Sequence, residues 1–213
     1  MISASTFGPA LARLAADGFV AYPTETVWGL GACADRPRAI ERLARWKGRA
    51  AGAPMSLLVS SVEAAPGMGC IVEGSARRLI EAFWPGPLTV VVPCRGRFAS
   101  GVRRADGALG LRCSAHPLAH ALAVAVGEAG LGPLTSTSMN RSGEPPARDL
   151  GAARALLQAS ETGDPAEPVL VSDSGHDAGG EAPSSVVDCT GETPEVLRVG
   201  AIDCGRLEAV WSR

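Results

Sequence analysis

Apolar residues recur along the chain at two different spacings. Short apolar runs bounded by Gly, Pro or polar residues are typical of buried strands, whereas apolar positions three or four residues apart are typical of helices. The segments expected to form strands are 18–22, 56–60, 88–93, 109–113, 133–137, 168–172, 185–189 and 195–199. The segments expected to form helices are 7–16, 35–47, 75–83, 117–128 and 149–159, together with the C-terminal tail. This alternation predicts a mixed α/β fold.

Capping and turn residues set the expected boundaries of these elements. Asp35 is expected to be the N-cap of a helix that has Pro37 in its first turn, and Ser75 is expected to cap the next helix. Pro117 opens a third helix, which is rich in Ala. Residues 173–184 are rich in Gly and small polar residues, so we expect a mobile loop there and consider it a candidate lid.

The length and composition favour one folded domain. A chain of 213 residues without an internal repeat fits a single domain over 1–213 and can bury a substantial core. Hydrophobic residues make up 46% and aromatic residues only 4%, so the core is expected to consist mainly of Ala, Val, Leu and Ile. The net charge of −2 argues against an extensive basic nucleic-acid surface but leaves a local basic patch open.

The cysteines and the apolar runs bear on the cellular compartment. The six cysteines are widely spaced and form no C-x-x-C pair, so we expect reduced, half-buried thiols rather than a disulfide framework. The N-terminus has no basic region followed by an apolar run, and no segment reaches the roughly 18 apolar residues of a membrane span. We therefore expect a cytoplasmic protein that does not associate with a membrane.

The most distinctive short segment is YPTETVWGLG, residues 22–31. Three oxygen-bearing side chains, Thr24, Glu25 and Thr26, follow the end of a predicted strand, and a Gly-x-Gly sequence comes next. Hydroxyl groups and free amides at a strand end can bind a small polar ligand. The segment can equally be a plain turn from a strand into a helix, and its spacing alone does not decide. It is not a dinucleotide-binding motif, because no third glycine opens a helix in register.

A basic helix follows this segment. Arg38, Arg42, Arg45 and Arg49 recur at steps of four, three and four residues, which places them on one helical face. Gly48 can end the helix in a left-handed conformation, which would turn Lys47 and Arg49 into one space suited to a polyphosphate. A solvated basic face is the alternative interpretation.

Two further polar groups are ambiguous from the sequence. Ser138, Asn140 and Ser142 lie in a loop after a strand, where they can bind a nucleotide or simply hydrogen-bond to their own loop. His116 and His120 have the spacing of metal ligands on a helix, but no third ligand is evident. His116 lies at the start of its helix, where it can contact an anion or cap the helix. The chain has no G-x-S-x-G and no Walker A sequence, so an ATP site would be of an unusual kind.

Taken together, these segments resemble the YrdC-like threonylcarbamoyl-AMP synthase family. The matching segments are YPTETVWGLG (22–31), K-G-R (47–49), the apolar strand after Pro54, WPGPLTVVVP (84–93), GLRCSAHPLA (110–119), TSTSMNRSGEPP (135–146), SSVVD (184–188) and LRVG (197–200). They occur in the family's order and cover nearly the whole chain, so the ordered set is highly specific although each segment alone is weak. The chain is similar to the short, single-domain form of the family.

The resemblance implies both a fold and a reaction. The fold is a twisted mixed β-sheet with flanking helices around a large positively charged cavity. The reaction joins L-threonine, bicarbonate and ATP into threonylcarbamoyl-AMP and pyrophosphate, for threonylcarbamoyladenosine modification of tRNA. Mg²⁺ is expected with the ATP and no metal site in the protein itself. tRNA and a downstream threonylcarbamoyl transferase complex are the implied partners.

The resemblance also assigns roles to ten residues. The residues at threonine-binding positions are Thr24, His116, Ser138 and Ser184. The residues at ATP-binding positions are Lys47, Arg49, Arg112, Asn140, Arg148 and Arg198. Lys47 and Arg49 are expected to be catalytic as well, because they would stabilise charge on the departing pyrophosphate.

The chain departs from the family pattern at several positions. Ala50, Ala53 and Pro54 stand where Pro and Asn-Pro are usual, Leu58 where a polar residue is frequent, Met139 for Ala, Arg148 for Thr and Ser185 for Thr. These departures bear on nucleotide contacts more than on the activity.

Two other functions compete with the synthase. A module that binds structured RNA would use the basic helix together with Arg95, Arg97, Arg103 and Arg104. A relative with the same fold and another acyl-adenylate chemistry is the second rival. The intact K-x-R and S-x-N sequences argue against that second rival.

Overall fold

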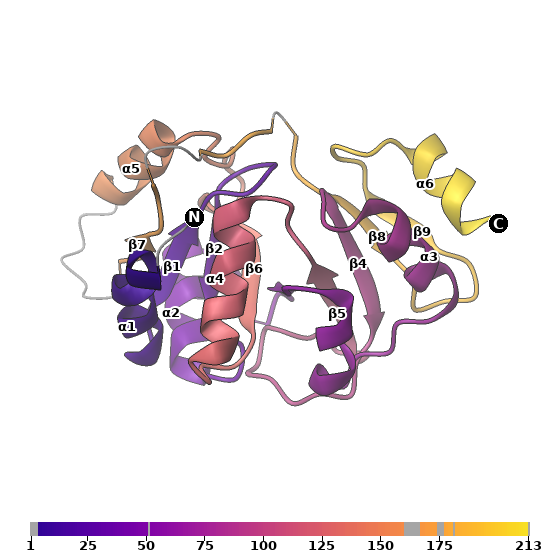
Figure 1. Cartoon of the computed structure of the whole chain (residues 1–213), viewed down its shortest axis with the longest axis horizontal. Coiled ribbons are helices and arrows are strands. Elements are labelled where there is room, and N and C mark those ends of the chain that lie inside the picture. The colour runs from indigo at the N-terminus through magenta and orange to yellow at the C-terminus, as the bar shows by residue number, and fades with distance from the viewer. Residues whose placement is uncertain (1–3, 51, 160–166, 174–176, 181, 213) are drawn as a thin grey trace.

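A computed structural model gives the fold (Figure 1) and describes residues 4–50, 52–159, 167–173, 177–180 and 182–212. The helices are η1 (Ala4–Phe7), α1 (Gly8–Ala15), α2 (Pro37–Lys47), η2 (Val62–Ala64), η3 (Pro66–Met68), α3 (Gly74–Phe83), α4 (Pro117–Glu128), α5 (Leu150–Gln158) and α6 (Cys204–Trp211). The strands are β1 (Phe19–Tyr22), β2 (Gly29–Ala32), β3 (Ser56–Leu58), β4 (Leu88–Pro93), β5 (Ala108–Arg112), β6 (Leu134–Ser138), β7 (Val169–Leu170), β8 (Ser185–Asp188) and β9 (Glu195–Arg198).

Among the described residues, nine strands form one sheet in the order β7-β1-β2-β6-β3-β5-β4-β8-β9. The pairs β1–β7, β3–β5 and β4–β8 are parallel. The pairs β1–β2, β2–β6, β3–β6, β4–β5 and β8–β9 are antiparallel. This arrangement confirms the mixed α/β fold. The assignment of one domain to 1–213 stays a prediction.

Successive residues of β1 bury their side chains on opposite sides of the sheet, which is why all four are buried. Phe19 and Ala21 belong to the larger core cluster, to which α2, α3 and α6 contribute. Val20 and Tyr22 belong to the second cluster, which α1 and α4 cover. Figure 1 shows α1 and α4 in the left half of the molecule and α3 and α6 in the right half.

The strand β2 was not expected, because Gly29 and Gly31 suggested a ligand-binding turn. A Cβ atom at Gly31 would lie 2.7 Å from the carbonyl oxygen of Thr135, and one at Gly29 would lie 2.9 Å from the ring of Tyr22. These glycines allow neighbouring strands and the Tyr22 ring to pack closely against β2, so they serve the sheet.

Two expected helix caps are wrong. The N-cap of α2 is Arg36 rather than Asp35, and Pro37 supplies the first helical residue. The N-cap of α3 is Glu73 rather than Ser75. Neither Arg36 nor Glu73 makes a side-chain capping bond, so packing rather than capping fixes where these helices begin.

Other boundaries shifted without changing the architecture. The expected strand 168–172 is only Val169–Leu170, and η2 and η3 were not expected. The C-terminal tail is helical as predicted, in α6. No helix in the described part of the chain combines the length and the apolar character needed to cross a membrane.

Candidate active site

A cavity of about 310 Å³ is lined by residues of β2, β3, β4, β5, β6, β8 and β9 and of the segments next to them. Its polar lining consists of hydroxyl groups and guanidinium groups, and none of its described lining residues is Asp or Glu. The hydroxyl residues are Thr24, Ser56, Thr89, Ser136, Thr137, Ser138 and Ser184. The cationic residues are Arg49, Arg104, Arg112 and Arg198. Six of the ten predicted site residues are therefore in the lining: Thr24, Arg49, Arg112, Ser138, Ser184 and Arg198.

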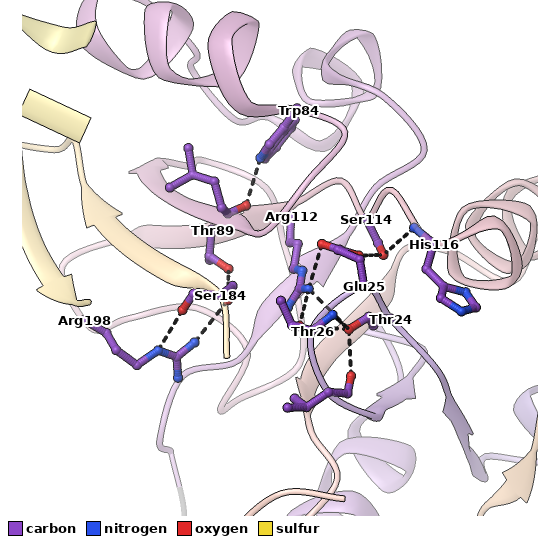
Figure 2. Close-up of polar contacts among 12 residues, drawn as sticks. Thr24, Glu25, Thr26, Trp84, Thr89, Arg112, Ser114, His116, Ser184 and Arg198 are labelled. Carbon is purple, nitrogen blue, oxygen red and sulfur yellow. Dashed lines mark hydrogen bonds and ion pairs between the residues drawn. The ribbon is translucent and has the colours of Figure 1, made fainter. Parts of the chain in front are cut away.

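The turn after β1 is built around the hydroxyl groups of Thr24 and Thr26, which lie 2.9 Å apart (Figure 2). The Thr24 hydroxyl donates to the carbonyl of Val27 over 2.6 Å and accepts from the Thr26 amide over 3.2 Å. Arg112 Nη2 donates to Thr24 Oγ1 at 3.3 Å, to Thr26 Oγ1 at 2.6 Å and to Glu25 Oε1 at 3.0 Å. The TET sequence therefore fixes the guanidinium of Arg112 at the cavity wall.

Glu25 is the counter-ion of Arg112. Its other carboxylate oxygen accepts a hydrogen bond from the Ser114 hydroxyl. Burial raises the pKa of Glu25, but the Arg112 charge and the Ser114 hydroxyl outweigh this effect, and the pKa is lowered overall. The Nε atom of Arg112 is buried and has no hydrogen-bond partner among the described residues.

A second arginine faces the cavity from β9. Arg198 donates from Nε to the Ser184 carbonyl at 3.0 Å and from Nη2 to the Ser184 hydroxyl at 3.1 Å. The Ser184 hydroxyl also contacts that of Thr89 at 3.1 Å (Figure 2). Burial and the nearby Arg112 charge lower the pKa of Arg198. Arg112 is buried and Arg198 is exposed, and two neighbouring guanidinium groups that repel each other are suited to bind an anion.

Arg104 is a lining residue that sequence reasoning missed. It was assigned only to a hypothetical RNA-binding surface. The structure shows it at the cavity, held by ion pairs with Asp106 and Asp188. Asp188 lies 84 positions after Arg104 in the sequence, so no local sequence pattern indicated that Arg104 lines the cavity.

Gly48 ends α2 in the left-handed conformation, with φ 61° and ψ 31°, as predicted. Beyond it, Arg49 reaches the cavity and donates from Nη2 to the Pro54 carbonyl over 2.6 Å. Lys47, which was expected to share this space, is not among the described lining residues of the cavity, and its contact with ATP stays a prediction. Lys47 is only 2% exposed, and its ammonium group contacts the Ser138 carbonyl and both oxygens of Asn140.

The S-x-N loop closes on itself around Lys47. Asn140 Oδ1 accepts from Lys47 at 3.0 Å and from the Ser138 hydroxyl at 2.6 Å. Asn140 Nδ2 donates to the carbonyls of Arg141 and Glu144, each at 2.8 Å. Asn140 therefore organises the loop, and it does not line the cavity, whereas Ser138 does. The alternative in which these side chains hydrogen-bond to their own loop holds for Asn140.

His116 and Arg148 also lie outside the cavity lining. His116 caps α4, because its Nδ1 accepts from the Leu118 amide at 3.3 Å. With Nδ1 acting as acceptor, Nε2 carries the proton and donates to the Asp177 carbonyl at 3.0 Å. Arg148 is exposed. No group of three metal-binding side chains occurs in the described ranges.

Two glycines of the Gly-rich segment 173–184 bind the TET turn. Gly179 donates to the Thr24 carbonyl at 3.2 Å, and Gly180 donates to the Thr26 carbonyl at 2.9 Å. Asp177 accepts from Trp28 Nε1 at 2.8 Å. Residues 174–176 and 181 lie outside the described residues, and the mobility of this segment stays a prediction.

Comparisons with known proteins agree with this architecture. A family model named for Sua5, YciO and YrdC, and described as telomere recombination, matches residues 12–200. A Mycobacterium tuberculosis H37Rv protein, provisionally named threonylcarbamoyl-AMP synthase, is 36% identical over 94% of this chain and 87% of its own. The threonylcarbamoyl-AMP synthase of Xanthomonas euvesicatoria is 38% identical over 77% of this chain and 90% of its own.

A solved structure extends the comparison. The crystal structure of P. abyssi Sua5 complexed with L-threonine matches 99% of this chain with a TM-score of 0.84 and 28% identity. This chain spans 58% of the length of that protein. The ordered motifs, the sheet and the matched residues 12–200 have one explanation: this chain belongs to the Sua5/YciO/YrdC family.

Proposed function

We propose that this protein is an L-threonylcarbamoyladenylate synthase, a nucleotidyltransferase that forms threonylcarbamoyl-AMP and pyrophosphate from L-threonine, bicarbonate and ATP. The observation that carries the proposal is a single cavity in which four arginines face a set of hydroxyl groups. The printed names of the relatives and the threonine bound to P. abyssi Sua5 support the same reaction. The product would serve tRNA modification in the cytoplasm, through a separate transferase.

The proposal divides the cavity between two substrates. Thr24, Ser138 and Ser184 offer hydroxyl groups that suit the ammonium, carboxylate and hydroxyl groups of threonine. Arg49, Arg112 and Arg198 offer guanidinium groups that suit the triphosphate. The arginines make the cavity positively charged in this proposal, because it exposes no carboxylate among its described lining residues.

The chemistry needs no protein nucleophile. The threonine amine attacks the carbon of bicarbonate, and loss of water gives a carbamate. A carbamate oxygen then attacks the α-phosphorus of ATP, and the bond from that phosphorus to pyrophosphate breaks as pyrophosphate leaves. The protein must bring two anions together and stabilise the charge that develops on the leaving group. Arg49, Arg112 and Arg198 are the proposed charge-stabilising residues. Lys47 contributes indirectly, because its ammonium group binds the Ser138 carbonyl and so positions the loop that contains Ser138.

Mg²⁺ is the proposed companion of the triphosphate. When bound, it would neutralise phosphate charge and orient the triphosphate. The cavity offers hydroxyl groups and guanidinium groups rather than carboxylates, so phosphate oxygens and water are its expected ligands.

Binding of structured RNA remains a second candidate, carried by the exposed Arg38 and Arg45 on α2. The arginines Arg112 and Arg198 do not fit it, because they are turned into a cavity rather than spread over a surface. tRNA binding is compatible with the synthase and is part of the proposal only as an accessory contact.

The direct test is a reaction containing the pure protein, threonine, bicarbonate, Mg²⁺ and ATP, followed by mass spectrometry. We expect a threonylcarbamoyl-adenylate whose mass shifts when ¹³C-bicarbonate replaces ordinary bicarbonate. A folded protein that binds ATP and forms no such adenylate would contradict the proposal.

A further inference from the structure

Cys70 and Cys94 face each other across a short antiparallel pairing that lies outside the active-site cavity. The Ile71 amide donates to the Pro93 carbonyl at 2.9 Å, and the Arg95 amide donates to the Gly69 carbonyl at 2.8 Å. These two bonds flank the cysteines, so the cysteines form a non-hydrogen-bonded pair, with a typical Cα separation of about 4.5 Å. That separation falls within the range of about 4.4–6.8 Å that a disulfide requires.

The two side chains point toward one another. Their Sγ atoms lie 2.7 Å apart, between the length of an S–S bond, about 2.05 Å, and an ordinary non-bonded contact of about 3.5–4.0 Å. Both residues are free thiols in the structure and only 4% exposed. The Cys70 thiol donates to Cys94 Sγ, and the Cys94 thiol donates to the Met68 carbonyl at 3.4 Å; the buried thiols of Cys33 and Cys113 contact only backbone carbonyls among their described hydrogen bonds.

Close backbone packing fixes the geometry of this pair. A Cβ atom at Gly69 would lie 2.7 Å from the Gly96 amide nitrogen, and one at Gly96 would lie 2.1 Å from the Met68 carbonyl oxygen. Glycine at both positions lets the two segments touch along their backbones. The cysteines therefore need little movement to form a bond.

We propose that Cys70 and Cys94 form an intramolecular disulfide when the protein meets a low-molecular-weight disulfide such as oxidised glutathione. One protein thiol loses its proton and attacks a sulfur of the oxidant, which releases one small thiol and leaves a mixed disulfide. The second protein thiol then loses its proton and attacks the protein sulfur of that mixed disulfide, which releases the second small thiol. The protein loses two protons and two electrons, and the oxidant leaves as two thiols.

Burial makes this oxidation slow. It raises the pKa of the Cys70 thiol, and the hydrogen bond to Cys94 adds to the effect, so little thiolate is present at neutral pH. The oxidant must also reach two buried sulfur atoms. Local opening of the segment around η3 is therefore expected to limit the rate of oxidation. Cys189 and Cys204 are more exposed and have no thiol partner among their described contacts, so mixed disulfides are expected there.

The bond would brace the segment that carries Arg104. The Cys94 amide donates to the Gly107 carbonyl at 3.0 Å, and the Cys94 carbonyl accepts from Arg103 Nη1 at 2.8 Å. The cysteines are 24 positions apart. Closing a loop of this size in the unfolded chain is expected to raise the melting temperature by roughly 5–10 °C.

The test is to incubate the full-length protein with oxidised glutathione, block the remaining thiols and digest with trypsin without reduction. We expect the tryptic peptide 50–77, which contains Cys70, to be linked to peptide 79–95, which contains Cys94. The link should disappear on reduction, and the oxidised protein should melt at the higher temperature.

Two variants make the result decisive. The double variant C189S/C204S should keep both the link and the rise in melting temperature, whereas C70S should lose both. Wild-type protein in which Cys70 and Cys94 remain free after prolonged oxidation would overturn the proposal, and so would preferential links to other cysteines. Neither readout depends on the proposed synthase activity.

Discussion

At the scale of single residues, Arg49 is the cavity arginine whose removal should separate catalysis from stability most clearly. Its Nε is buried and has no hydrogen-bond partner among the described residues, and its one described hydrogen bond goes to the Pro54 carbonyl. Arg49→Ala should lower turnover about 10²–10³-fold, because it removes a charge-assisted contact to the departing pyrophosphate. The melting temperature should change little.

Two variants control the Arg49 experiment. Arg49→Lys should recover little activity, because an ammonium group cannot reproduce the guanidinium fork. Arg45→Ala removes an exposed arginine from α2, the helix that ends before Arg49, and should leave turnover near the wild-type value. Turnover measured by pyrophosphate release checks all three variants, and wild-type turnover in folded Arg49→Ala protein would remove Arg49 from the mechanism.

Lys47 should give a different, pH-dependent signature. Burial, with the Arg49 and Arg141 charges, lowers the pKa of Lys47 from 10.5 to about 8. Between pH 8 and 10.5 the unfolded chain therefore binds more protons at this residue than the folded protein, so its contribution makes folding more favourable as the pH rises through this window. Relative to Lys47→Met, the wild type should gain about 1–2 kcal/mol in free energy of unfolding between pH 8 and 9.5.

Denaturant unfolding of both proteins at these two pH values measures the difference. Equal pH slopes for wild type and Lys47→Met would show that folding does not lower the pKa of Lys47. At pH 7.5, Lys47→Met should also lower turnover, because the loop that contains Ser138 loses its hydrogen bond from the Lys47 ammonium group.

At the scale of elements, the strand β2 depends on glycine where other residues would clash. Gly31→Ala places a methyl group 2.7 Å from a side-chain carbon of Leu134 and from the Thr135 carbonyl, so it should destabilise the protein by about 1–3 kcal/mol. Gly127→Ala is the matched control, because Gly127 lies within α4 with nothing within 4 Å of the added methyl. It should stabilise by about 0.5–1 kcal/mol. Urea unfolding checks both, and equal stability of the two variants would contradict this description of β2.

The elements also show how far the sequence leads. The strands β4, β5 and β8 were predictable, because Val and Leu runs end at clear turn residues. The strand β2 was not, because GLGA has no β-branched residue and its strand state depends on pairing with β1 and β6. Cap residues misled at Asp35 and Ser75, since tertiary packing overrides weak local preferences.

For the site, the sequence motifs predicted which residues lie near the cavity but not which of them line it. The resemblance placed Thr24, Arg112 and Arg198 correctly at the cavity. It did not separate Arg49, which lines the cavity, from Lys47, which holds a loop 91 to 93 positions away. That distinction depends on how the chain closes in three dimensions.

At the scale of the whole molecule, the cavity exists because distant parts of the chain meet in one sheet. Its lining extends from Thr24 at the end of β1 to Arg198 on β9. The ion pair of Glu25 with Arg112 joins segments 87 positions apart, and the bonds of Arg198 to Ser184 join β9 to the start of β8. Substrate binding is therefore a property of the complete sheet, and both substrates should bind to one folded unit.

The most direct test of one cavity for two substrates is the dependence of pyrophosphate release on threonine. With ATP, Mg²⁺ and bicarbonate present, release should be near background without threonine and should rise on its addition, with one threonylcarbamoyl-adenylate formed per pyrophosphate. Serine should support the reaction about 10–200-fold less efficiently, because it lacks the methyl group that the lining residue Val27 can contact. Equal pyrophosphate release with and without threonine would contradict the proposed synthase.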